Sequence, residues 1–163
     1  MVEMTDTIEI GGVAFESHWR DGLRLCRRDP GYEAFGVPSV PAFPERVRVD
    51  ITISAEAPSS PSGPSVYGGE TWAMFVEDGL RVFVSPAGAA NDPDFWTVRH
   101  TLTPPRADIR VGPRFRRPSP DGSPLFIHPV AYPVDQLLLI HTLATRRGLL
   151  LHAVRLADGV VAD

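Results

Sequence analysis

Alternating apolar and polar residues between positions 46 and 54 give the clearest single-strand signal in this chain. Val47, Val49 and Ile51 share one face, while arginine, aspartate and threonine side chains share the other. A period of two is typical of a strand that buries one face and exposes the other. We therefore expect a half-buried strand over residues 46–54.

Two apolar runs, TWAMFVE and LRVFVSP, flank the dipeptide Asp78-Gly79. A two-residue Asp-Gly connection favours a tight hairpin, because both central positions need positive φ. In the predicted register Glu77 lies opposite Leu80, and both faces of the hairpin carry apolar side chains. We expect this hairpin to lie inside a sheet or to be covered on both sides.

Shorter strand signals recur along the rest of the first 127 residues. They cover residues 7–15 with a bend at Gly11-Gly12, and residues 23–26, 95–102, 108–115 and 125–127. The chain has 17 prolines and 14 glycines, which collect between these segments, and residues 57–69 predict a flexible connection.

An almost wholly apolar segment near the end predicts the main helix, from Pro133 to about Arg147. Pro133 suits the first helical turn, Asp135 the positive end of the helix dipole, and Gly148 the stop. Its leucines leave hardly any polar face, so we expect burial on most sides. Residues 149–154 then predict a short strand, and Asp158-Gly159 a turn. Many strands followed by one helix predict an α+β fold with a largely antiparallel sheet and long Pro/Gly-rich loops.

Composition indicates a globular chain of one domain, or a domain with a fragment of another. Its 163 residues are 43% hydrophobic with a formal net charge of −4, which gives no indication of a nucleic-acid partner. The locally basic stretch over residues 106–117 predicts a solvated strand and loop. No apolar run approaches membrane-spanning length, and the lone Cys26 excludes an internal disulfide. We expect a cytoplasmic protein without a membrane partner.

The segment PVDQLLLIHTLATRRGLLLHA, followed by the turn at residues 158–159, carries a family resemblance. The order of helix, glycine, LLLHA strand and Asp-Gly turn resembles HPr kinase/phosphorylase-related proteins and their PEP-carboxykinase-like relatives. In those proteins such a segment leads into a strand and the nucleotide-binding P-loop. The resemblance covers roughly the last fifth of this chain. Val154 and Arg155 stand where members commonly have small residues. The chain contains no lysine and no GxxxxGK[ST] motif.

The resemblance implies a β-rich N-terminal domain over residues 1–127 and a lead-in to a nucleotide-binding core over residues 128–163. Our first hypothesis is an accessory or substrate-recognition part of an ATP-dependent serine kinase, with a protein or peptide substrate and a C-terminal kinase core. ATP and magnesium would belong to the complete protein, and this chain would hold no cofactor and perform no catalysis. The alternative is a complete, non-enzymatic module that binds a protein or peptide through its sheet edge or loops.

Candidate chemical residues are few, and none is assigned a catalytic role. His152, in the LLLHA strand, is the one weak candidate for supporting a nucleotide site, although a structural role is the stronger interpretation. The histidines show no metal-ligand spacing, and we expect His141 to be a hydrogen-bonded core residue. Cys26 is expected to be inert packing. The remaining candidates are aspartates expected in turns or at the helix start, namely Asp92, Asp94, Asp121 and Asp135.

Overall fold

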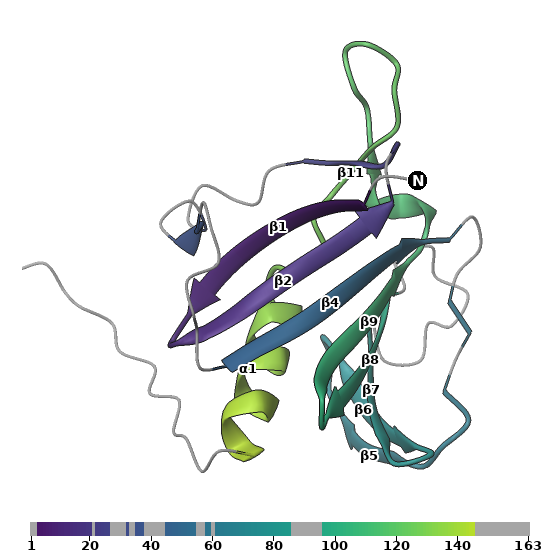
Figure 1. Ribbon diagram of the computed structural model, residues 1–163. Helices are drawn as coiled ribbons and strands as arrows, with labels where there is room; N and C mark the ends of the chain where they lie inside the picture. Colours follow the sequence, from purple (N-terminus) through teal and green to yellow (C-terminus); the bar gives the residue numbers. More distant parts are fainter. Residues whose placement is uncertain are drawn as a thin grey trace, which may run out of the picture.

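The computed structural model describes residues 3–20, 22–26, 32, 35–37, 45–54, 58–59, 61–85 and 96–145. Most of the strand residues lie in one large sheet, and one α-helix follows them (Figure 1). The strands of the large sheet are β1 Glu3–Ile10, β2 Val13–Arg20, β4 Glu45–Ile53, β5 Ser65–Gly68, β6 Ala73–Glu77, β7 Leu80–Ser85, β8 Trp96–Leu102 and β9 Pro105–Val111. The helix α1 spans Val134–Thr145.

The eight-stranded sheet has the order β1-β2-β4-β9-β8-β7-β6-β5. Every neighbouring pair is antiparallel except β2–β4 and β4–β9, which are parallel. The fold is therefore α+β with a mostly antiparallel sheet, as the sequence predicts. The two parallel pairs arise because β4 lies between β2 and β9 and runs in the same direction as both.

The hairpin β6–β7 matches the predicted register, with Glu77 opposite Leu80. Asp78 has φ 51° and Gly79 has φ 78°, the pair of positive values that a tight Asp-Gly turn needs. The strand predicted over residues 46–54 is also confirmed, since Val47 and Val49 on β4 are fully buried. Local pattern therefore specified both elements correctly.

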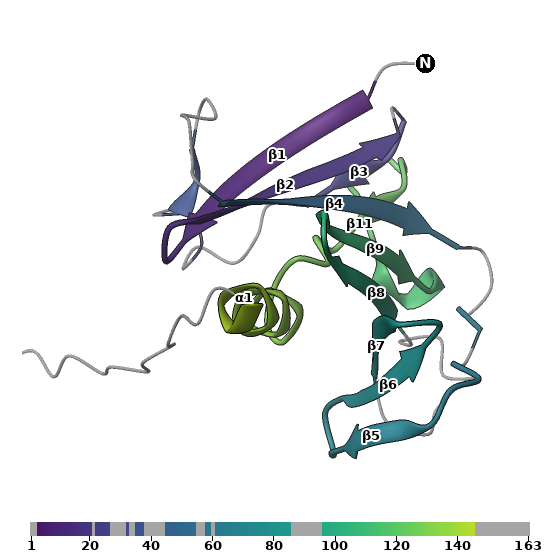
Figure 2. The same ribbon diagram turned by 60° about the horizontal axis from the view of Figure 1, so that its bottom comes forward.

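The sheet curls around α1, which lies on its concave face (Figure 2). The core joins alternate strand residues of that face to one side of the helix, where Leu138 is 0% exposed. Half of the α1 residues are buried, whereas Ile140 is 43% exposed. The expectation that the helix is buried on most sides is therefore met only on the side that faces the sheet. The core cluster includes Phe15, Val47, Val49, Phe83, Val98, Ile109, Val134, Leu137, Leu138 and Leu139.

The opposite, convex face carries the polar residues of the same strands. On β4 and β9 these are Arg46, Arg48, Asp50, Arg106, Asp108 and Arg110. Three very short strands, β3 Arg24–Leu25, β10 Arg116–Arg117 and β11 Leu125–Phe126, form a second small sheet in the order β10-β11-β3.

Two predicted elements need correction. Residues 57–69 were expected to form a flexible connection, yet they contain β5, which pairs with β6 across an irregular register. The strand expected over residues 108–115 begins earlier and ends at Val111, after which Pro113–Phe115 form a 3₁₀ turn. The prolines in these stretches mislead because they border the elements rather than lie within them.

The predicted strand at residues 149–154, the turn at 158–159 and His152 lie outside the described residues. The same holds for the predicted end of the helix near Gly148. The division between residues 127 and 128 stays a prediction, although α1 packs into the same core as the strands.

Candidate functional site

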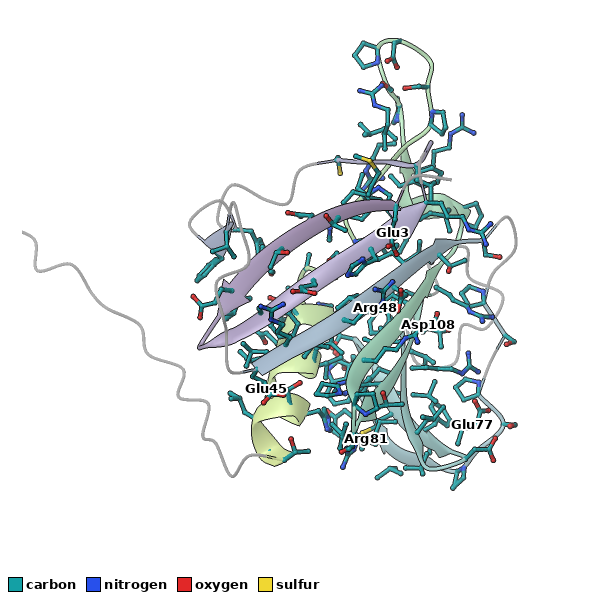
Figure 3. The ribbon with its side chains drawn as sticks, viewed as in Figure 1. Glu3, Glu45, Arg48, Glu77, Arg81 and Asp108 are labelled. Atoms are coloured by element: carbon teal, nitrogen blue, oxygen red, sulfur yellow. The ribbon has the colours of Figure 1, made fainter. Side chains whose placement is uncertain are left out.

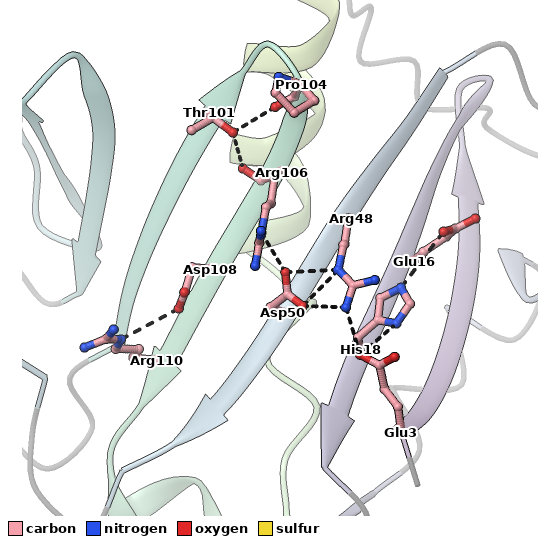
Figure 4. A network of polar contacts seen from close by, with 10 residues as sticks. All are labelled: Glu3, Glu16, His18, Arg48, Asp50, Thr101, Pro104, Arg106, Asp108 and Arg110. Atoms are coloured by element: carbon pink, nitrogen blue, oxygen red, sulfur yellow. Dashed lines mark hydrogen bonds and ion pairs between the residues drawn. The ribbon is translucent and has the colours of Figure 1, made fainter. Parts of the chain in front are cut away.

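The convex face presents a network of alternating charges across four strands (Figure 4). Arg48 Nη2 donates to Glu3 Oε1 at 2.8 Å, and Arg48 Nε donates to Asp50 Oδ1 at 3.0 Å. Arg106 Nε donates to Asp50 Oδ2 at 2.9 Å from the neighbouring strand. Because Arg48 and Arg106 lie opposite each other in the parallel register, Asp50 is held between two guanidinium groups.

His18 extends this network on β2, between two carboxylates. Its Nδ1 lies 3.4 Å from Glu3 Oε1, and its Nε2 lies 4.0 Å from Glu16 Oε2. A surface hollow adjoins it, lined by Glu3, His18, Trp19, Arg20, Asp50, Ile51 and Thr52. The residue types would suit acid–base chemistry, yet each charge already faces an opposite charge.

The electrostatics of this network favour a structural role. A hydrogen bond to Asp50 is the largest cause that raises the pKa of Arg48 above its usual value, so the arginine stays charged. Exposed ion pairs of this kind contribute only about 0–1 kcal/mol each. The network joins β1, β4 and β9 through ion pairs. Among the described residues, the ring nitrogens of His18 make no hydrogen bond and lie only within ion-pair distance of Glu3 and Glu16.

A second polar group lies between the first strands and the start of α1, where the Asp6 side chain is 41% exposed. Asp6 and Ser17 are paired on β1 and β2, and His128 Nε2 lies 3.6 Å from Asp6 Oδ2. These types match a nucleophile, base and acid, but Ser17 is 0% and His128 is 3% exposed. A substrate cannot reach a serine in that position, so the group ties elements together.

Tyr32 makes contacts in the same region, at the start of α1. Its hydroxyl donates to Asp135 Oδ2 at 2.7 Å and accepts from the Tyr132 backbone N–H at 3.1 Å. Asp135 was expected to be a helix-start residue, and it lies in the first turn of α1. Its carboxylate also holds a distant part of the chain, which no local pattern indicates.

Glu77 on β6 holds the segment that leads into β5, the last strand of the sheet order. Its carboxylate accepts from the Ser62 N–H at 2.9 Å and from Arg99 Nη2 at 2.9 Å. The Ser62 N–H is the largest cause that lowers the pKa of Glu77 to about 2. A Cβ on Gly63 would lie 2.0 Å from the Val76 carbonyl oxygen, so only glycine permits this close crossing. These contacts fix the segment that enters β5.

β5 is the last strand at this end of the sheet, and all four of its residues are exposed. Val66 is 58% and Tyr67 is 49% exposed, and Val76 on β6 is 40% exposed. The Tyr67 ring packs on Trp72 with centroids 4.4 Å apart. The free edge, meaning Ser65–Gly68 with these apolar neighbours, is the exposed apolar surface best suited to a partner.

The opposite edge of the sheet is partly covered. Ile8 on β1 bridges Gly36, and the Val37 N–H donates to the Thr7 carbonyl at 3.3 Å. Within the described part of the chain, no segment pairs with the outer side of β5.

The remaining sequence candidates have local roles. Asp121 caps a turn, and hydrogen bonds from Ser119 and then Ser123 lower the pKa of its carboxyl. Cys26 is half-buried, and its thiol forms no disulfide. Its backbone N–H donates to the Phe126 carbonyl at 2.7 Å. His141 lies beside Phe83 on the concave face, with ring centroids 4.9 Å apart. His152, Asp92 and Asp94 lie outside the described residues.

Among the described residues no three histidine, cysteine or acidic side chains come together as a metal site. None of the helices in that part of the chain has the length and apolar character needed to cross a membrane. The sequence did not identify β5 as a strand, because β5 is short and its flanks are rich in proline, glycine and serine. The only signal for it in the sequence was the pair Val66 and Tyr67. Comparison of the chain with protein-family models, with curated proteins and with solved structures finds no match.

Proposed function

We propose that this protein is a non-catalytic recognition module that binds an extended peptide segment of a partner protein along the free edge. The observation that carries the proposal is the strand β5 at the end of the sheet, all four residues of which are exposed, with Val66 58% exposed. An extended peptide adds to such an edge through backbone hydrogen bonds, and alternate side chains supply specificity.

The construction of the edge supports a specific ligand rather than open-ended association. Pro64 precedes β5, and the register shifts between Ser65 and Tyr67. Proline and bulges are the devices that limit pairing at exposed edges. They leave a short accessible length, which suits one short segment. Tyr67, held on Trp72, offers a rigid aromatic contact of the kind that often dominates binding energy.

The test is selection of linear peptides from a display library on the full chain, followed by fluorescence anisotropy. We expect selected peptides to have apolar residues at alternate positions and to lose at least about tenfold in affinity on Val66→Asp, which places a charge on the edge. Ile140→Asp is the matched control, because Ile140 is also an exposed apolar residue, 43% exposed, but lies on α1. Peptides that bind both variants equally, or that slow amide exchange away from residues 65–68, would reject the free edge as the site.

The resemblance of residues 133–159 to HPr kinase-related proteins supports a narrower second proposal. In it the module recognises the protein or peptide substrate of an ATP-dependent serine kinase, within which it acts as an accessory part. The residues of this chain do not fit ATP and magnesium themselves, since the sequence has neither a lysine nor a glycine-rich phosphate loop. No step of phosphoryl transfer can be assigned to it.

Calorimetric titration of the full chain with ATP and magnesium tests this second proposal. We expect no saturable micromolar binding, because positioned backbone donors and metal ligands supply nearly all phosphoryl-transfer chemistry. Micromolar binding that His152→Ala abolishes would contradict it and place a nucleotide site within this chain.

A further inference from the structure

Three basic side chains meet on the concave face beside the second half of α1. Arg81 on β7 lies directly opposite His100 on β8 in the antiparallel register. His141 projects toward them from α1, with its ring 4.9 Å from that of Phe83, two positions after Arg81 on the same strand. Figure 3 shows Arg81 close to the C-terminal half of α1. We call Arg81, His100 and His141 the basic cluster.

The basic cluster lacks acceptors. No hydrogen bond or ion pair engages Arg81 within the part of the chain that the structure describes, whereas Arg48, Arg99 and Arg106 are all paired with carboxylates there. His100 is 1% exposed, and neither of its ring nitrogens has a hydrogen-bond partner. Buried polar groups are normally satisfied, and leaving one unpaired costs about 1–3 kcal/mol. The ring nitrogens of His100 are therefore open to a change of protonation when a ligand binds beside them.

The mutual repulsion of the three basic groups indicates that a ligand of the cluster carries a negative charge. Burial is the largest cause that lowers the pKa of His100 to about 4, followed by the charges of His141 and Arg81. Burial and then Arg81 also lower the pKa of His141. None of these causes is a carboxylate, so both histidines are neutral near pH 7 beside a charged arginine. A bound anion would reverse this effect and stabilise the protonated imidazoles.

We propose that the basic cluster is a binding site for a tetrahedral oxyanion, with Arg81 and His141 as its direct contacts. Arg81 offers a bidentate guanidinium fork from the sheet, and the half-buried His141 offers an N–H from the helix above it. Donors from two layers suit a tetrahedral group better than a planar one. His100, opposite Arg81 on the neighbouring strand, takes up a proton when the anion is bound. The site lies on the concave face and does not depend on peptide binding at the free edge.

The direct test follows the histidine ring signals of the full chain by NMR during titration with sodium sulfate. Sulfate is the probe because its charge stays constant between about pH 5.5 and pH 7.5, and sodium chloride at equal ionic strength is the reference. We expect saturable shifts of His100 and His141 with sulfate only, and a rise in the pKa of both rings. Because binding and protonation are linked, sulfate affinity should increase at least about threefold on going from pH 7.5 to pH 5.5.

Arg81→Gln should weaken sulfate binding at least about tenfold. It should also abolish the rise in the pKa of His141 that sulfate causes. Arg110→Gln is the matched control, since Arg110 is an arginine of β9 on the convex face, 3.7 Å from Asp108. His141→Gln tests the second contact and should remove most of the pH dependence. Thermal unfolding of each variant in chloride shows whether it is folded.

Inorganic phosphate, O-phosphoserine and acetate complete the comparison. Tighter binding of O-phosphoserine than of phosphate would support the site and assign it to an esterified phosphate; the reverse would support it and assign it to a free ion. Acetate that binds as well as sulfate would overturn the tetrahedral assignment. Equal responses to sulfate and chloride, or an unchanged affinity in Arg81→Gln, would overturn the site altogether.

Discussion

The two faces of the sheet handle their arginines in opposite ways. On the convex face Arg48 and Arg106 share Asp50, with donor–acceptor distances of 3.0 and 2.9 Å. On the concave face Arg81 stands beside two histidines and, among the described residues, meets no carboxylate. A charge that the fold already satisfies stabilises the fold weakly, whereas a charge that the fold leaves unsatisfied is available to a ligand.

The difference also separates stability from binding. Surface ion pairs contribute little because water and salt screen both partners. The concave face derives its stability from apolar packing against α1, where Leu138 and Val49 are 0% exposed. The basic cluster at its margin adds unfavourable electrostatics to that core. We therefore expect substitutions on the two faces to differ in size, in pH dependence and in salt dependence.

The largest expected effect comes from the apolar core of the concave face. Leu138→Ala should lower the free energy of unfolding by about 2–5 kcal/mol, because it leaves a cavity between α1 and the sheet. Ile140→Ala on the same helix should change it by no more than about 0.5 kcal/mol, since Ile140 is 43% exposed. Urea unfolding of both variants measures the difference. Equal losses would mean that α1 does not pack as described.

The pH dependence of stability should come next in size and should belong to the concave face. Burial lowers the pKa of His100 from 6.5 to about 4, so acid favours the unfolded chain. The corresponding stability is complete above about pH 6.5 and is lost as the pH falls toward 4, with a loss of at most about 3 kcal/mol.

His100→Gln should flatten the stability curve between about pH 6.5 and 4.5, and saturating sulfate should flatten it in the wild type. Glu77 provides an internal check, because its pKa falls from 4.5 to about 2 and its contribution is lost only below about pH 4.5. A wild type and a His100→Gln variant with parallel curves would rule out His100 as the source.

A smaller effect is expected at the turn that carries β7. Gly79 has φ 78°, and a side chain in this left-handed region costs about 1–2 kcal/mol, more for a β-branched residue. Gly79→Val should therefore destabilise the hairpin and weaken the sulfate response of the nearby Arg81. Asp78→Asn is the control, since asparagine tolerates positive φ. Thermal unfolding and the sulfate titration measure the two effects, and an unchanged Gly79→Val variant would contradict the turn geometry.

The smallest effect compares one arginine from each face. Arg48→Gln should cost no more than about 1 kcal/mol at low salt and less at high salt, because it breaks screened ion pairs. Arg81→Gln should be neutral or slightly stabilising without an oxyanion, because it removes a charge that opposes its neighbours. Urea unfolding at low and high sodium chloride separates the two. A salt-dependent loss in Arg81→Gln would show that Arg81 has a carboxylate partner after all.

The accuracy of sequence reasoning follows the range of the interactions. The β6–β7 hairpin was predicted to the residue, because its turn type and alternation lie within a few positions of each other. β5 was not predicted, because prolines and glycines around it resemble a linker, and only pairing with β6 makes Ser65–Gly68 a strand. Histidine spacing indicated no site, because Arg81, His100 and His141 lie 19 and 41 residues apart along the chain and come together only in the fold.

The sequence by itself determined the local elements: the half-buried strand β4, the Asp-Gly turn and the apolar helix α1. Each depends on periodicity or on the φ preference of one or two residues, which act over short distances along the chain. The tertiary structure alone decided that β4 pairs in parallel with β2 and β9. Within the described residues it also decided that β5 has one unpaired edge and that the basic cluster faces α1 without a carboxylate partner. Such outcomes depend on which segments, far apart in sequence, pack against one another. The free energy that stabilises this packing comes from the whole core and not from any one local pattern.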